Sequence, residues 1–345
     1  MQDDAASHNT HQHADPGQPL EHGGRLAEAR RRFPDAPAPF LDLSTGINPV
    51  AYPVGNIPQA AWARLPEPDA LDQLQAAAAT AYGASDPAMI VAAPGTQILI
   101  SLLPRLLPQD RVSILGPTYA EHAAAWQHAG IPTTEVEDVV ELHHARCAVL
   151  CNPNNPDGRR WSPPDLLALA DSIARRDGLL IVDEAFADMA PEWSLVPYLP
   201  HPALLILRSF GKAFGLAGLR LGFALTLPSR ASRLRAALGP WAVSGPAIAI
   251  ANHALADRAW IQAARIRLAH DATRLDALLL AAGLHIVGGT TLFRLATHDN
   301  APALFDRLGQ AGILVRRFSD RPRWLRFGLP GDQPGWDRLA AALRT

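Results

Sequence analysis

The middle of the chain alternates short apolar runs with amphipathic stretches, and this alternation narrows the possible folds more than any other feature. The apolar runs predict strands at 89–92, 111–115, 147–151, 179–183, 203–207 and 219–225. Helical patterns fall between several of these strands, at 96–107, 118–129 and 164–176. Apolar strands joined by helical crossovers are typical of a mostly parallel sheet covered by helices on both faces. The sequence therefore predicts an α/β fold.

The pattern changes after Pro240. A long helical region is expected to about Ala282, and short strands follow at 284–287, 291–295, 313–316 and 324–327, with helices at 302–311 and 336–343. We interpret this part as a smaller α+β domain. A chain of 345 residues also exceeds one ordinary core. We expect a disordered tail at 1–20, an N-terminal arm at 21–45, a large domain at 46–240 and a small domain at 241–345.

Charge and hydropathy argue against several classes of protein. The formal net charge of -2 gives no reason to expect nucleic acid or an anionic membrane as a partner. No apolar run reaches the roughly 18 residues of a membrane-spanning helix, and the first twenty residues do not resemble a signal peptide. Cys147 and Cys151 alternate on an apolar strand, so packing is expected rather than a disulfide framework. We expect a cytoplasmic protein.

Lysine is almost absent from the chain. Of the 31 basic residues, Lys212 alone is lysine. Arginine replaces lysine at most surfaces at little cost, but it cannot act as a nucleophilic amine, because guanidinium stays protonated and forms no imine. Lys212 is therefore a candidate nucleophile, and the alternative is a leftover surface lysine.

The neighbours of Lys212 argue against that alternative. Ser209 and Lys212 follow the strand at 203–207, and parallel α/β sheets place their ligands at such strand ends. Arg220 lies eight residues after the lysine. Ser209 and Arg220 can both bind phosphate, and arginine can do so with two parallel hydrogen bonds.

A second strand, at 179–183, ends in the carboxylates Asp183 and Glu184. Asp183 can pair with a cationic ring nitrogen of a cofactor. It could instead cap a helix or bind a metal, as in nucleotide-binding proteins. The chain has no Gly-x-x-x-x-Gly-Lys-Ser/Thr loop, so the usual partner of the nucleotide-binding alternative is missing.

Two weaker segments complete the set. Asn155 lies in a turn rich in Asn, Pro and Gly just after the strand at 147–151, and its amide can donate to a ring oxygen. Gly95, Thr96 and Gln97 stand at a predicted helix start, where backbone N–H groups form an anion site.

Taken in their order along the chain, the four segments resemble the class I/II aminotransferase superfamily, the fold type I enzymes that use pyridoxal phosphate (PLP). The resemblance runs from about His22 to the C-terminus. It implies a mostly parallel mixed sheet between helices, with 46–240 as the PLP-binding domain and a homodimer. By the resemblance, Lys212 holds PLP as a Schiff base, Asp183 meets the pyridine nitrogen and Asn155 bonds the ring hydroxyl. The remaining cofactor contacts implied are Gly95, Thr96, Gln97, Ser209 and Arg220 around the phosphate and Tyr119 stacked on the ring.

Within the superfamily, the chain resembles the branch that contains threonine-phosphate decarboxylase of cobalamin biosynthesis and histidinol-phosphate aminotransferase. The segments around His22-Gly23-Gly24 and Asn48-Pro49, and Phe186 after Asp183-Glu-Ala, are similar to the decarboxylase. The resemblance implies decarboxylation of L-threonine O-3-phosphate to (R)-1-aminopropan-2-ol O-phosphate, with no metal. The implied substrate contacts are His22, Gly23, Asn48, Asn155, Arg316 and Arg326.

Two residues depart from the family pattern, and alternatives stay open. Phe186 cannot donate the hydrogen bond of the usual Tyr, and Leu65 replaces a Tyr that reaches the partner subunit. Arg317 should face away from Arg316 if both lie on a strand. The nearest alternative is an aminotransferase such as histidinol-phosphate aminotransferase. A non-catalytic ligand-sensing module and a plain nucleotide-binding protein are more distant ones.

Overall fold

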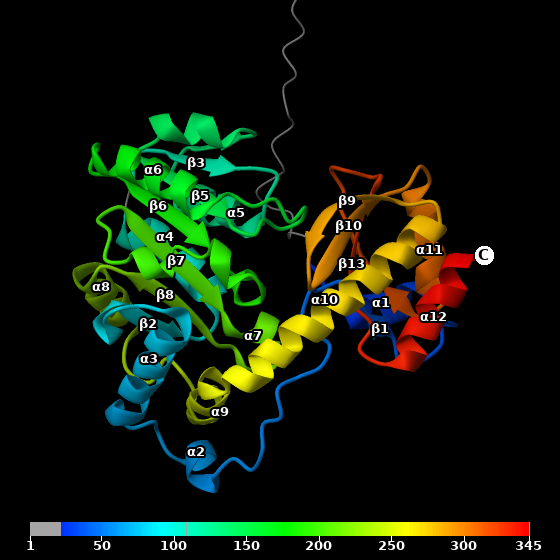
Figure 1. The fold of residues 1–345 in the computed structure, drawn as a ribbon, viewed down its shortest axis with the longest axis horizontal. Helices are drawn as coiled ribbons and strands as arrows, with labels where there is room; N and C mark the ends of the chain where they lie inside the picture. The colour runs from blue at the N-terminus through cyan, green and yellow to red at the C-terminus, as the bar shows by residue number, and fades with distance from the viewer. Residues whose placement is uncertain (1–21, 108, 345) are drawn as a thin grey trace, which may run out of the picture.

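A seven-stranded sheet forms the centre of the larger unit of the protein (Figure 1). The computed structural model describes residues 22–107 and 109–344, so the tail expected at 1–20 lies outside the described residues. The strand order is β2-β8-β7-β6-β5-β3-β4. Neighbours from β7 to β4 are parallel, and β8 is antiparallel to both β7 and β2. The strands are β2 (Ile90–Ala93), β3 (Val112–Leu115), β4 (Thr133–Val136), β5 (Cys147–Cys151), β6 (Leu179–Asp183), β7 (Leu204–Ser209) and β8 (Gly222–Thr226).

Helices cover both faces of this sheet, because its strands are apolar on both sides. Along β5, Val149 packs in one cluster and Leu150 in the other. One face is covered by α4 (Thr96–Leu106), α5 (Glu121–His128) and α8 (Pro228–Leu238). The other face is covered by α3 (Pro68–Tyr82), α6 (Pro163–Ala174) and α9 (Gly245–Ala256). The expected α/β fold with a mostly parallel sheet is confirmed.

A smaller antiparallel sheet, in the order β12-β13-β10-β9, lies in the C-terminal part of the chain. Its strands are β9 (His285–Thr290), β10 (Phe293–Thr297), β12 (Arg316–Arg317) and β13 (Trp324–Gly328), and its helices are α11 (Ala301–Gln310) and α12 (Gln333–Arg344). The N-terminal arm joins this unit, since β1 (Leu41–Asp42) pairs in parallel with β11 (Ile313–Leu314). After α1 (Leu26–Arg32), the ring of Phe33 packs against Phe305 of α11.

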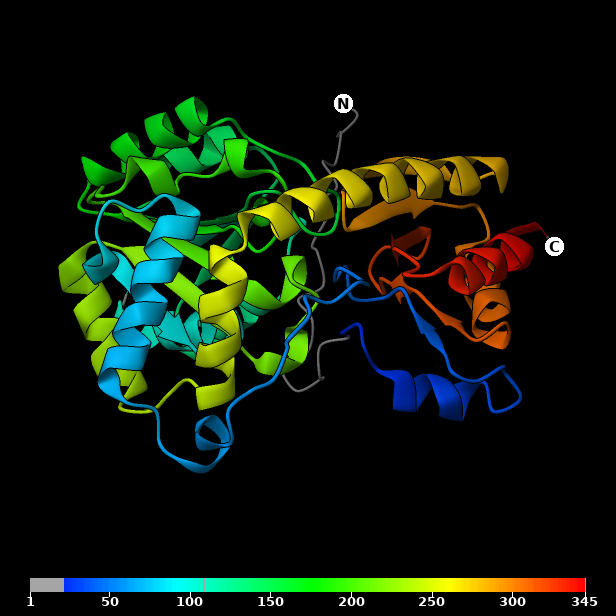
Figure 2. The same cartoon turned by 60° about the horizontal axis from the view of Figure 1, so that its bottom comes forward.

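A single long helix, α10 (Arg258–Ala281), runs from the larger unit to the smaller one (Figures 1 and 2). Two short helices remain: α2 (Gln59–Ala63), on a segment at the periphery of the larger unit, and α7 (Phe210–Ala213), directly after β7. The 3₁₀ turns are Pro87–Met89, Val139–His144, Ala187–Met189, Pro191–Trp193, Val196–Tyr198 and Ala217–Leu219. No helix within the described ranges has the length and apolar content that crossing a bilayer requires.

The structure departs from the sequence-based expectation at a few short strands. β4 was not expected, because its sequence Thr-Thr-Glu-Val is polar and it lies at the edge of the sheet. The strand expected at 313–316 is two strands, β11 and β12, which belong to different sheets. β1 is too short for its two residues to show any periodicity.

Candidate active site

Most of the residues that the sequence singled out lie at the carboxyl ends of the parallel strands. Asp183 is the last residue of β6, and Lys212 lies in α7 just after β7. Asn155 lies in the turn after β5, and Gly95 caps α4 after β2. This is the edge at which open α/β sheets bind ligands.

Lys212 points toward the N-terminal arm and the small sheet rather than into open solvent. Its Nζ donates to the carbonyl of Thr45 at 3.2 Å and lies 5.6 Å from the ring centre of Phe186. Burial, and then the nearby guanidinium of Arg326, lower the pKa of Lys212 to about 8, against the opposing charge of Asp183. About one amine in ten is therefore neutral and nucleophilic at pH 7, far more than for an ordinary lysine.

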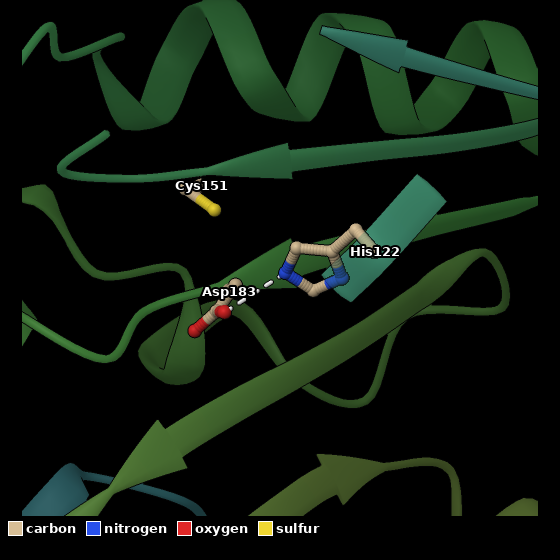
Figure 3. A group of neighbouring side chains, drawn as sticks. All are labelled: His122, Cys151 and Asp183. Atoms are coloured by element: carbon tan, nitrogen blue, oxygen red, sulfur yellow. Dashed lines mark hydrogen bonds and ion pairs between the residues drawn. The ribbon is translucent and has the colours of Figure 1, made fainter. Parts of the chain in front are cut away.

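Asp183 is held from behind by a buried histidine (Figure 3). His122 Nε2 lies 2.9 Å from Asp183 Oδ2, and the other carboxylate oxygen accepts the N–H of Ala185 at 3.0 Å. Burial alone would lower the pKa of His122, but Cys151 and Asp183 together raise the pKa above its ordinary value. A ring nitrogen of His122, the sulfur of Cys151 and a carboxylate oxygen of Asp183 all lie within 4.8 Å of one another, so the three side chains form one polar cluster.

An anion cradle lies beside the lysine, where helix α4 begins. Gly95 has φ +88°, and a Cβ there would lie 2.7 Å from Arg220 Nη2. No side chain caps the N-terminus of α4, which starts at Thr96, and the hydroxyl of Ser209 makes no capping bond to α7. A free helix N-terminus, a guanidinium and a hydroxyl are the groups that bind a phosphate.

A chain of hydrogen bonds runs along the outer wall of the site. The hydroxyl of Tyr119 donates to Gln97 Oε1 at 3.2 Å, and Gln97 Nε2 donates to Glu121 Oε2 at 2.7 Å. Glu121 Oε1 lies 2.8 Å from His22 Nε2. The rings of His22 and Tyr119 are 6.2 Å apart, so both side chains face the same region.

Buried arginine closes the side opposite the large sheet. Arg326 donates to Asn155 Oδ1 through Nη1 and to the carbonyl of Ser44 through Nη2 at 2.8 Å. Burial, and then the charge of Arg316, lower the pKa of Arg326 to about 9. Arg316 stands opposite Arg326 in the β12–β13 register. Two cations so close together favour an anionic ligand between or beside them.

Two residues that the sequence selected, Asn48 and Gly23, make contacts within the protein. Asn48 donates to the carbonyl of Ala213 at 2.8 Å, and its amide oxygen accepts from Arg267 at 3.0 Å. Gly23 packs on Ser44, where a Cβ would meet the Ser44 carbonyl at 2.4 Å. Direct substrate contacts of Asn48 and Gly23 stay predictions.

Arg317 and Glu184 are directed away from the residues around Lys212. The guanidinium of Arg317 lies over the ring of Phe305 in α11, 5.2 Å from its centre, so this side chain faces the helical layer. Glu184, the second carboxylate after β6, is buried against Arg208 at 2.8 Å and Ser194 at 2.6 Å, so it stabilises the fold.

Sequence reasoning missed four residues of this region, namely His122, Cys151, Glu121 and Thr45. Cys151 was expected only to pack, yet the Thr118 hydroxyl lies 3.1 Å from its sulfur in the polar cluster. Glu121 and His122 are adjacent, two and three positions after Tyr119, and form a polar pair at the start of α5. That pair was the one available signal, and it is common at helix N-termini.

Fold and site together define an enzyme of the aminotransferase type, with one lysine at the carboxyl edge of a mostly parallel sheet and a smaller sheet facing it. The chain belongs to the aminotransferase class I and II family, whose model matches residues 57–343.

Two relatives align with almost the whole chain and have more specific names than the family. The chain is 46% identical over 327 residues to the threonine-phosphate decarboxylase of Pseudomonas aeruginosa, covering 94% of this chain and 97% of that one. It is 44% identical to the enzyme of the same name from a Sinorhizobium species, covering 94% and 98%. Among solved structures, it is similar to histidinol-phosphate aminotransferase from Sinorhizobium meliloti in complex with pyridoxal 5'-phosphate. That match has a TM-score of 0.79 and 24% identity and covers 95% of this chain and 94% of that one.

Proposed function

We propose that the protein is a PLP-dependent carboxy-lyase that converts L-threonine O-3-phosphate to (R)-1-aminopropan-2-ol O-phosphate in cobalamin biosynthesis. The near full-length similarity to two threonine-phosphate decarboxylases carries this proposal. The likeness to the solved structure of histidinol-phosphate aminotransferase, at 24% identity, concerns the fold alone. The lysine, the strand-end carboxylate, the buried Arg326 and the neighbouring Arg316 are the groups that such chemistry requires.

The residues present fit PLP. Lys212 supplies a partly neutral amine for the covalent bond, and Asp183, backed by His122, supplies the carboxylate for the ring nitrogen. The remaining ligands we propose are Gly95, Thr96, Gln97, Ser209 and Arg220 around the phosphate and Tyr119 against the ring. Asn155 uses its amide oxygen on Arg326, which leaves Nδ2 to donate to the ring oxygen. When bound, PLP supplies an electron sink for the electrons left at Cα when CO2 departs.

The protein's own residues set the orientation of the substrate. We propose that Arg326 holds the carboxylate and that His22 and Arg316 hold the phosphate. Two anchors at different ends of a small molecule fix its rotation relative to the cofactor, and that rotation would select the bond that breaks. Positioning of this kind is worth several kcal/mol. These arginines therefore decide whether the carboxylate or the Cα hydrogen is lost.

Lys212 then has a second task. Departure of CO2 leaves an electron pair at Cα, and a proton must replace it. The Nζ of Lys212, with its pKa lowered to about 8, can hold and release that proton near neutral pH. Phe186, which packs edge-on against Phe293 with ring centres 5.0 Å apart, borders this Nζ with apolar surface and excludes water.

We also propose a homodimer, with 46–240 as the PLP-binding domain, 241–345 as the small domain and 21–45 as an arm that contributes to the substrate site. Exposed apolar side chains support the dimer: Trp62 and Leu65 are each 63% exposed and Trp241 is 58% exposed. The segments that carry these residues are neighbours, since α2 packs against the start of α9, where a Cβ on Gly245 would lie 2.3 Å from the Ala61 carbonyl. A cytoplasmic location belongs to the same proposal.

A substrate assay tests the proposed activity. Purified holoenzyme should release CO2 from threonine phosphate without any added oxo acid. Histidinol phosphate with an oxo acid is the comparison reaction. If amino-group transfer to the oxo acid occurs and threonine phosphate releases no CO2, the protein is an aminotransferase and the proposed function is wrong.

A further inference from the structure

The N-terminal arm is tied to both units of the protein next to the site. The N–H of Gly24 donates to Ser44 Oγ at 2.7 Å, and Gly23 packs on the Ser44 carbonyl. Ser44 follows β1, which is paired with the C-terminal β11. His22, the residue before Gly23, contacts Glu121 at the start of α5 in the larger unit. The His22–Glu121 contact therefore bridges the two units.

The hydrogen-bond directions around Glu121 are fixed by chemistry. A carboxylate only accepts, so Gln97 must present its amide nitrogen to Glu121 and its amide oxygen to the Tyr119 hydroxyl, as the distances show. His22 must likewise carry a proton on Nε2 to bond Glu121 at 2.8 Å. Among residues 22–107 and 109–344, no hydrogen-bond partner is recorded for the opposite edge of the imidazole, with Nδ1, so that edge is oriented for a ligand.

We propose that Glu121 is a positioning residue, which latches the N-terminal arm over the site and orients His22 toward the substrate phosphate. This inference rests on the proposed function, because it takes His22 as a phosphate ligand. Glu121 acts through His22, while Gln97 ties the same carboxylate to the wall that carries Tyr119. The competing role is a purely local one, since an acidic residue in the first turn of a helix also stabilises that helix.

Three variants of Glu121 separate the two roles. Glu121→Ala should raise the KM for threonine phosphate about tenfold, as expected for loss of one charge-assisted hydrogen bond, and change kcat by less than about threefold. Glu121→Gln keeps one acceptor oxygen at the same reach for His22, and its amide N–H can meet Gln97 once that amide turns, so this neutral variant should recover part of the loss. Glu121→Asp keeps the charge at the helix start but is one methylene too short to reach His22, so it should resemble Glu121→Ala. Full recovery by Asp would overturn the latch.

A double-mutant cycle tests whether Glu121 acts through His22. The variant His22→Ala with Glu121→Ala should have the same KM as His22→Ala alone, because the second substitution has nothing left to orient. Independent, multiplicative losses would contradict the proposal. The holoenzyme's visible absorption should stay unchanged in each variant, and its loss would show that Glu121 supports the cofactor instead.

Hydrogen exchange tests the latch without any substrate. In the wild-type holoenzyme, the Gly24 amide should be protected by Ser44, and Glu121→Ala should speed its exchange at least about fivefold by releasing His22. Unchanged exchange would contradict the latch. If the protein fails to decarboxylate threonine phosphate, the proposed function fails, and this exchange measurement still decides whether Glu121 holds the arm.

Discussion

Asp183 combines the two features that the proposed electron sink needs, a buried carboxylate and a fixed orientation through His122. Replacing Asp183 with Asn keeps the shape but removes the charge. Loss of one partner from a buried ion pair costs about 3–5 kcal/mol, which corresponds to a fall in kcat of roughly 10²–10⁴-fold. Steady-state CO2 release measures this, with the absorbance of retained PLP as the control. A decrease smaller than about tenfold would show that Asp183 does not stabilise the carbanion.

The lowered pKa of Lys212 gives a pH prediction with a definite sign. Only the neutral amine bonds the cofactor aldehyde, so the rate of PLP uptake by apoenzyme should rise with pH and level off above about pH 8. An ordinary lysine would keep gaining neutral amine up to its usual pKa near 10.4. Stopped-flow absorbance at fixed PLP follows the uptake. A rate that keeps rising tenfold per pH unit beyond pH 9 would contradict the lowered pKa.

Single residues were predictable from sequence where the chemistry allows no substitute. Lys212 stood out because arginine cannot replace a nucleophilic amine, and Asp183 because it ends an apolar strand. His122 and Glu121 were not predicted, since their partners, Asp183 and His22, are 61 and 99 positions away in the chain. Glu184 resembled Asp183 in sequence, but neighbouring strand-end residues point to opposite faces, and Glu184 meets Arg208 instead.

The turn from β2 into α4 is the element on which the anion cradle depends. Gly95→Ala places a Cβ 2.7 Å from Arg220 Nη2 in a left-handed backbone conformation. We expect at least about tenfold weaker retention of PLP, because displacing this arginine removes a charge-assisted hydrogen bond to the phosphate. Dialysis followed by absorbance measures retention.

Gly130→Ala is the matched control for that variant. Gly130 also has a positive φ, +75°, but no atom lies within 4 Å of its would-be Cβ. Gly95 lies at φ +88° and ψ 159°, a region that glycine alone adopts readily, so Gly95→Ala should lower the unfolding temperature at least as much as Gly130→Ala. Equal loss of PLP from both would mean that general destabilisation, and not the cradle, explains the effect.

Elements were predictable to the extent that burial shaped their sequences. β5 and β6 lie where the continuous apolar runs placed them, because both faces of these strands are buried. The polar edge strand β4 carried no such signal. The sequence pattern could not separate the short strands β11 and β12. They belong to different sheets because β11 pairs with β1 and β12 pairs with β13.

The described surface of the molecule exposes three large apolar side chains, those of Trp62, Leu65 and Trp241, and the proposed dimer would bury them. Trp62→Arg should therefore shift the protein toward monomer, measured by light scattering over a range of concentrations. Val140→Arg is the control, because Val140 is 61% exposed on a separate 3₁₀ turn. A wild-type monomer, or an unchanged Trp62→Arg dimer, would contradict the proposed interface.

Covalent attachment of the cofactor tests the central claim most directly, because the chain has a single lysine. Borohydride reduction of the PLP-loaded protein, followed by proteolysis and mass spectrometry, fixes and locates the bond. The mass of reduced PLP should appear on the peptide that contains Lys212 and should vanish in Lys212→Ala. Reduced protein with no added mass on Lys212, or Lys212→Ala that keeps both cofactor absorption and turnover, would contradict the account.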